Sequence, residues 1–152
     1  MKKTAQSQHR GRLLIGQFCD DIRIEVGNKL TLVGCYGDEM LVPAFPITLP
    51  KIAVQAKAIT PIEQPFEKLI FRLLIEGNLL GQIETSGESL STTPEIEVGR
   101  ASWLWLAAAM VVSPLVIHAP SEIVLIADTE RGELVGSKLR VRLSAEIEKN
   151  SR

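Results

Sequence analysis

Two cysteines and several acidic residues lie within one short stretch near the start of the chain, CDDIRIEVGNKLTLVGCYGDEM, residues 19–40. Cys19 and Cys35 enclose the adjacent pair Asp20 and Asp21. Thiolates and carboxylates bind metal ions and take part in acid–base chemistry, so such a stretch could form a reactive site. A zinc site commonly uses closely spaced Cys and His ligands such as CxxC pairs, and the sequence has no such pair. We therefore expect no metal site at the cysteines.

The alternation of side chains predicts that this stretch belongs to a β-hairpin. Residues 11–24 carry apolar side chains on their even positions, and residues 30–36 form the second strand. A three-residue loop of residues 27–29 places apolar side chains opposite apolar ones, whereas a two-residue loop does not. We expect Gly27 or its neighbour Asn28 to supply the positive φ that such a loop requires.

The predicted hairpin gives its acids different environments. Asp20 is expected to point inward, opposite Tyr36, and a buried carboxylate must be hydrogen-bonded or it becomes protonated. The Tyr36 hydroxyl could provide that hydrogen bond, which predicts a structural role for both residues. Asp21 is expected to lie opposite Cys35 on the outward face. The alternative is a hydrolase that uses Asp20 or Asp21.

The pattern of the whole chain predicts an all-β protein. Short strands separated by Gly and Pro turns, without a long segment of helical period, are typical of an antiparallel β-sandwich of the immunoglobulin-like or a similar type. We expect about eight or nine strands. The three prolines of residues 41–50 predict an extended crossing there. The clearest further strands are expected at residues 51–60, 66–75, 79–83, 123–127 and 134–143.

Length and charge narrow the possible classes of protein. A chain of 152 residues forms one ordinary domain, which we expect at 12–148, with a basic flexible tail at 1–11 and a short tail at 149–152. The net charge of −1 provides no general attraction to nucleic acid. The basic start is not followed by an apolar run, so we expect a cytoplasmic protein with free thiols.

Residues 101–119 contain no Asp, Glu, Lys or Arg and are long enough to raise the question of a membrane span. Pro114 divides this run, so we expect a buried element of a globular domain and no membrane span. Residues 102–112 could be strand or helix, and we favour a strand with both faces covered. Trp103 and Trp105 share one face of that strand. They could pack in the core or, on an open sheet, anchor a protein partner.

Several acids fall in expected loops. Asp38, Glu39 and Asp128 would be ordinary turn residues in solvent. If their loops met at one end of a sandwich, they could instead bind calcium or a small ligand. No phosphate-binding glycine motif or GxSxG nucleophile motif occurs, so we expect no cofactor.

The chain also resembles a family of known proteins. CDDIRIEVGNKLTLVGCYG, the following VPAFPITLPKIAVQAKAITP and then PFEKLIFRLLIEGN are similar to a small uncharacterised bacterial and phage-associated family. Its members share an (A/C)DDIR–E–GNK–SL–G–YG opening followed by LPK and a TP turn. The resemblance covers residues 17–80 and implies a compact β-sandwich without an assigned activity. Arg23 of the shared motif could hold a nearby carboxylate.

These observations together predict a binding protein that is not an enzyme. We expect its partner to be another protein, through Trp103 and Trp105, or a second copy of itself in a homo-oligomer. We expect no nucleic acid and no membrane as partner. The resemblance alone suggests a phage or prophage setting. The alternatives are the calcium or small-ligand sandwich and the hydrolase.

Overall fold

The computed structural model describes residues 11–85, 95–98 and 101–144. The predicted tails, apart from Gly11, and the last residues of the predicted domain lie outside these ranges. The described strands are β1 (Leu13–Glu25), β2 (Lys29–Cys35), β3 (Glu39–Val42), β4 (Ile47–Leu49), β5 (Ile52–Pro61), β6 (Leu69–Ile75), β7 (Asn78–Glu84), β8 (Glu95–Val98), β9 (Ala101–Val112), β10 (Leu115–Ile117), β11 (Ser121–Thr129) and β12 (Gly132–Leu143).

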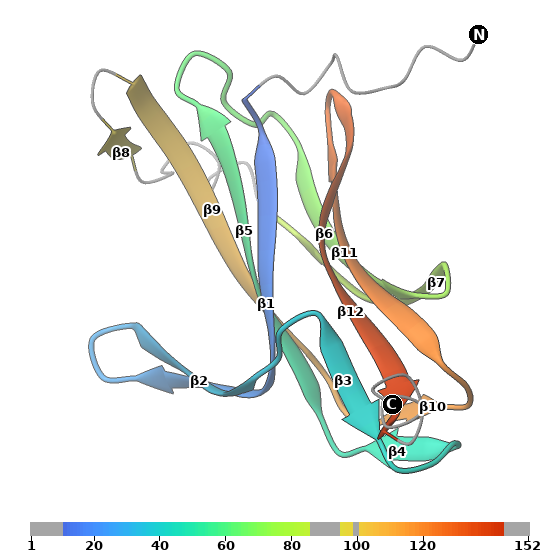
Figure 1. The fold of residues 1–152 in the computed structure, drawn as a ribbon. Coiled ribbons are helices and arrows are strands. Elements are labelled where there is room, and N and C mark those ends of the chain that lie inside the picture. Colours follow the sequence, from blue (N-terminus) through green and yellow to red (C-terminus); the bar gives the residue numbers. More distant parts are fainter. Residues whose placement is uncertain (1–10, 86–94, 99–100, 145–152) are drawn as a thin grey trace, which may run out of the picture.

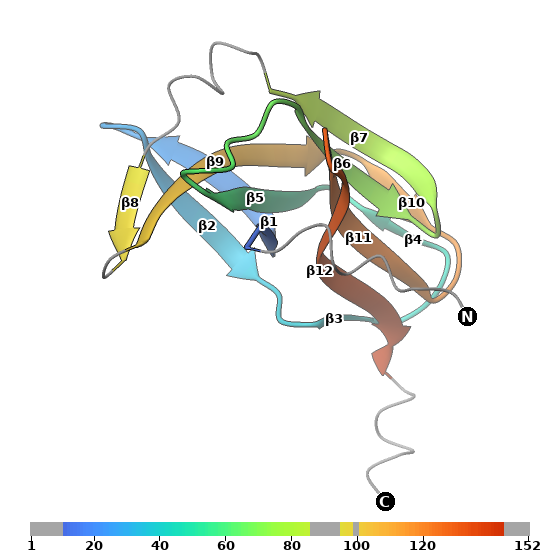
Figure 2. The ribbon, with the colours of Figure 1, turned by 90° about the horizontal axis from the view of Figure 1, so that it is seen from above.

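Two five-stranded sheets face one another, which confirms the predicted β-sandwich (Figure 1). The first sheet has the order β2-β1-β5-β9-β8, and the second has the order β3-β12-β11-β6-β7. Neighbouring strands are antiparallel except β3 and β12, which are parallel, so the sandwich is not antiparallel throughout. Figure 2 shows how β3 reaches its place beside β12. The chain leaves β2 of the first sheet and crosses to the edge of the second sheet, where it forms β3.

The described residues form more strands than the eight or nine expected. The proline-rich crossing contains β3 and β4, and β4 pairs with β10 in a small separate ribbon. The prolines at positions 43, 46 and 50 lie between or after these short strands, so they do not interrupt a ladder. β8 is a further strand at the edge of the first sheet, which was not expected from the sequence.

The apolar run at residues 101–119 forms β9 and β10, which confirms the preference for a strand. Residues Ser113 and Pro114 separate the two strands. In the parts of the chain that the structure describes, no helix has the length and apolar character needed to cross a membrane.

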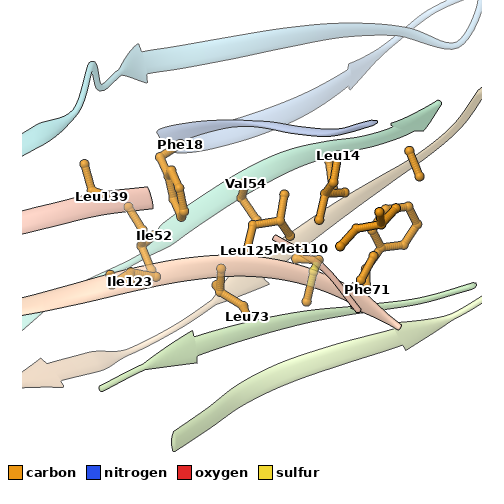
Figure 3. Packing of buried hydrophobic residues seen from close by; sticks show 14 of the residues in the cluster. Leu14, Phe18, Ile52, Val54, Phe71, Leu73, Met110, Ile123, Leu125 and Leu139 are labelled. Atoms are coloured by element: carbon orange, nitrogen blue, oxygen red, sulfur yellow. The ribbon is translucent and has the colours of Figure 1, made fainter. Parts of the chain in front are cut away.

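The core lies between the sheets and is built mainly from alternate residues of the strands that face each other. Phe18 of β1 and Val54 of β5 face Leu73 of β6 and Leu125 of β11 across the sandwich (Figure 3). All four side chains are exposed by 2% or less. Such period-two burial explains why these segments form strands with one face toward the core.

β1 and β12 approach each other closely at one side of the sandwich, although they belong to different sheets. The backbone N–H of Gly16 donates a hydrogen bond to Ser137 Oγ at 2.9 Å. A Cβ atom on Gly136 would lie 2.7 Å from Leu14 Cγ, and one on Gly16 would lie 2.6 Å from Leu125 Cδ2. Glycine at position 136 therefore allows β1 and β12 to approach closely, and glycine at position 16 leaves room for Leu125 of β11.

Arg12, the first residue after the predicted basic tail, is buried between the two sheets. Its side chain is 0% exposed, and Glu130 binds it at 2.6 Å. Its other donors reach the hydroxyl oxygens of Thr60 and Thr129, and its carbon Cζ lies 4.6 Å from the centroid of the Phe66 ring. Arg12 also donates to two backbone carbonyls of the loop after β5, at 3.0 Å each. This buried cation thus connects both sheets at one end.

Acid should weaken this connection through Glu130. Burial raises the pKa of the Glu130 carboxyl, but hydrogen bonds from Arg12 and nearby backbone N–H groups outweigh burial and hold the pKa below its ordinary value. A carboxyl with a lowered folded pKa stabilises the fold above its unfolded pKa of about 4.3, and this contribution is lost as pH falls through the folded pKa.

Glu130→Gln should therefore melt at a lower temperature than the wild type at neutral pH, and this difference should shrink as the pH falls below about 4.3. Melting temperatures measured over that pH range test this expectation. Glu63→Gln serves as a control because Glu63 is exposed. A Glu130→Gln deficit that stays constant with pH would contradict the role assigned to the carboxylate.

Candidate functional site

The β1–β2 hairpin has a three-residue loop, but its register differs from the expected one by two residues. Ile24 pairs with Leu30, and the loop consists of residues 26–28. Gly27 and Asn28 both have positive φ, +82° and +57°, as the loop was expected to require. A shift of two residues leaves every side chain on the same face, so the apolar pairing is kept although the partners change.

Asp20 is exposed, so the prediction of an inward carboxylate was wrong. The pairing of β1 with β5 ends at Cys19, and the hairpin beyond it projects away from the second sheet (Figure 1). The predicted hydrogen bond exists nevertheless, because the Tyr36 hydroxyl donates to Asp20. Burial, followed by this bond, raises the pKa of the Tyr36 hydroxyl. Gly34, at φ +64°, leaves room for the Asp20 side chain.

Arg23 and Asp21 lie together on the hairpin, as the resemblance suggested for Arg23. Arg23 Nε lies 3.7 Å from Asp21 Oδ2, and the arginine side chain is mostly exposed, so this pair contributes little stability. Lys51 binds Asp21 more closely, at 2.7 Å. That hydrogen bond lowers the pKa of the Asp21 carboxyl.

The acids considered for calcium are not brought together, and the expectation that Glu39 and Asp128 lie in loops was wrong, because they belong to β3 and β11. Glu39 binds Arg142 at 2.8 Å beside the last part of β12, whereas Asp128 binds Arg72 at 2.6 Å near the other end of that strand. Asp38 lies in the turn before β3. Within the described ranges, no group of three or more His, Cys, Asp or Glu side chains could hold a metal ion. These acids therefore do not form one site.

A hollow of ≈ 580 Å³ lies where β1 and β12 approach each other. Tyr36 and Asp38 line it from the connection after β2, and Lys138 and Arg140 line it from β12. Lys138 already binds Glu122 at 2.9 Å. This hollow is polar, and part of its charge is neutralised within the protein.

The outer face of the first sheet, which points away from the core, is largely apolar. Leu13 and Ile15 on β1 and Val111 on β9 are each exposed by half or more. Trp103 and Trp105 lie on the same face of β9 and are half-buried, so they belong neither to the core cluster nor to open solvent. The expectation that β9 is covered on both faces was therefore wrong, because nothing in the described structure covers its outer face fully.

A groove of ≈ 510 Å³ lies between this face and the hairpin. Figure 1 shows the hairpin of β1 and β2 bending away from the second sheet, on the outer side of the first. Ile24 and Leu30 line the groove from the hairpin, and Trp105 and Ala107 line it from β9. Apolar side chains from two elements thus meet across a space wide enough for a peptide segment or a ligand.

Lys57 of β5 supplies the groove with a cation. Its ammonium lies 5.3 Å from the centroid of the Trp105 ring, in a cation–π contact. The ion pairs formed among the described residues do not include Lys57. The groove therefore combines an aromatic side chain, aliphatic side chains and an exposed positive charge.

Sequence reasoning identified Trp105 but missed Lys57 and the hairpin side of the groove. The alternation of residues 51–61 places Lys57 on the same strand face as Gln55. Two polar side chains on one face indicate that this face points away from the core. The bend that brings Ile24 over this face has no such local signal, because it results from the point at which β1 leaves β5.

Comparison with models of known protein families finds no model that matches the chain. No curated protein sequence matches it significantly either. The resemblance of residues 17–80 to the bacterial and phage-associated family therefore stays a prediction.

Proposed function

We propose that this protein is a binding module that holds a segment of another protein in the groove between the hairpin and the outer face of the first sheet. The observation that carries the proposal is the apolar surface around Trp105, continued by Val111 on the same strand and by Leu13 and Ile15 on β1 of the same sheet. Single exposed apolar residues are ordinary, but a continuous apolar face is typical of an interaction surface.

Charge defines the partner more closely. Lys57 lines the groove beside Trp105, so a partner segment with a carboxylate between large apolar side chains would complement it. A second copy packed by the same face is a less suitable partner for Lys57. Its Asp21, a carboxylate on that face, already binds Lys51 of its own chain. We therefore propose a different protein as partner and the cytoplasm as the location. The resemblance adds a phage or prophage setting to the proposal.

The alternative functions have weaker support in the geometry. Asp20 and Asp21, considered for a hydrolase, are bound by Tyr36 and Lys51. Two of the acids considered for calcium, Glu39 and Asp128, lie at separate places on the second sheet and bind arginines.

Selection of displayed random peptides on the folded full-length protein tests the proposal. We expect the selected peptides to share an Asp or Glu flanked by large apolar residues. Trp105→Ala and Lys57→Gln should each weaken binding of a selected peptide at least about tenfold, which corresponds to about 1.4 kcal/mol. Fluorescence titration with labelled peptide measures this change.

Val135→Ala is the matched control, because Val135 is 58% exposed but lies on β12 of the second sheet. It should bind selected peptides as the wild type does. Peptides that bind equally well to Trp105→Ala would contradict the proposed site. A dimer of the pure protein that dissociates on Trp105→Ala would instead show that the face binds a second copy.

A further inference from the structure

The two cysteines are direct neighbours across the hairpin. Cys19 of β1 pairs with Cys35 of β2, whereas the sequence had placed Asp21 opposite Cys35. Beside them, the backbone N–H of Tyr36 donates to the carbonyl of Phe18 at 2.9 Å. Hydrogen-bonded and non-hydrogen-bonded pairs alternate along an antiparallel ladder, so the cysteines form a non-hydrogen-bonded pair with Cα atoms about 4.5 Å apart. Disulfides usually span about 4.4–6.8 Å between Cα atoms, so this separation falls within the range, at its short end.

The two thiols differ in their access to solvent. Both are free, but Cys19 is fully buried and Cys35 is exposed. A dissolved oxidant can therefore reach Cys35 first, whereas Cys19 can react only with a group already held beside it. This combination of an exposed thiol and a covered neighbour is the arrangement of a thiol that is attacked first and a second thiol that resolves the product.

We propose that Cys19 and Cys35 form a redox-active dithiol that a small disulfide, such as glutathione disulfide, converts into a cross-strand disulfide. The Cys35 thiolate attacks one sulfur of glutathione disulfide, forms a mixed disulfide and expels one glutathione thiolate. The Cys19 thiol then loses its proton, and its thiolate attacks Cys35 Sγ and expels the second glutathione. The protein loses two electrons and two protons, and one glutathione disulfide is reduced to two glutathione molecules.

The second step should be the slower one at neutral pH. Burial, followed by the proximity of Cys35, raises the pKa of the Cys19 thiol. The thiolate is the attacking form, so ring closure should accelerate as the pH rises. The disulfide would fix the base of the hairpin that holds Ile24 and Leu30 over the groove.

The test treats reduced full-length protein with glutathione disulfide under native conditions, followed by alkylation of remaining thiols and measurement of the intact mass. The wild type should lose both thiols and carry no glutathione, and its peptide map should contain Cys19 joined to Cys35. Cys19→Ala should carry one glutathione on Cys35. Cys35→Ala should keep its Cys19 thiol and carry none.

Wild-type protein that keeps glutathione on Cys35 even at raised pH would overturn the proposal, and so would equal glutathione labelling of both variants. Disulfide-linked dimers as the main wild-type product would overturn it as well. The peptide map of the wild type decides the matter even if Cys19→Ala does not fold. Partner binding enters none of these readouts, so the outcome is independent of the proposed function.

Discussion

Arg12→Met should lower the free energy of unfolding by about 3–5 kcal/mol, the cost of breaking a buried ion pair by removing one partner. The substitution keeps much of the side-chain volume but leaves the carboxylate of Glu130, only 18% exposed, without its cation. It also removes the donors that reach the hydroxyls of Thr60 and Thr129. Urea unfolding followed by tryptophan fluorescence measures the loss.

Arg131→Met is the matched control for charge and shape. Arg131 is next to Glu130 in the chain, but its side chain is 43% exposed and its Nε lies 3.6 Å from the carboxylate. An exposed ion pair of this kind contributes about 0–1 kcal/mol. Similar losses for both variants would show that charge, not burial of Arg12, determines the effect.

The role of Arg12 could not be read from the sequence, because its partners come from distant parts of the chain. Thr60 is 48 residues away and Thr129 is 117 residues away. Locally, Arg12 simply ends a basic stretch that looks like a solvated tail. A buried arginine becomes visible only when the fold brings several acceptors to it.

The strands, by contrast, could be predicted because period-two alternation is a local property. It correctly placed β1, β2 and β5 and predicted the β-sandwich to which they belong. The register of the hairpin was missed by two residues because both registers keep the same faces together. Only the geometry of the loop at residues 26–28 distinguishes them.

Alternation also shows which residues share a face, but it does not show what covers that face. This limit explains both errors about burial. Asp20 follows the even, inward positions of β1, yet the second sheet no longer lies opposite it once β1 has left β5. Trp105 lies on the outer face of β9, where the sequence could not decide between a core and an open surface.

Gly136→Ala should lower the free energy of unfolding by about 1–3 kcal/mol, as overpacking of a well-packed site does. The new Cβ atom would lie 2.7 Å from Leu14 Cγ and 3.1 Å from the Leu14 backbone oxygen. The side chain of Leu14 could turn away, but its carbonyl belongs to the β1 backbone, which the ladder with β5 holds in place. The strain must therefore separate β1 from β12 or distort one of them.

Gly37→Ala shows what the same substitution does without a close neighbour, because a Cβ atom there would meet nothing within 4 Å. Alanine restricts the unfolded chain and stabilises by about 0.4–1 kcal/mol where the backbone accepts it. Urea unfolding should thus move the two variants in opposite directions from the wild type. Because the unfolded-state effect is common to both, their difference isolates the steric cost at Gly136. Equal stabilities would mean that β1 and β12 can separate without loss, and that the close approach does not hold the sandwich together.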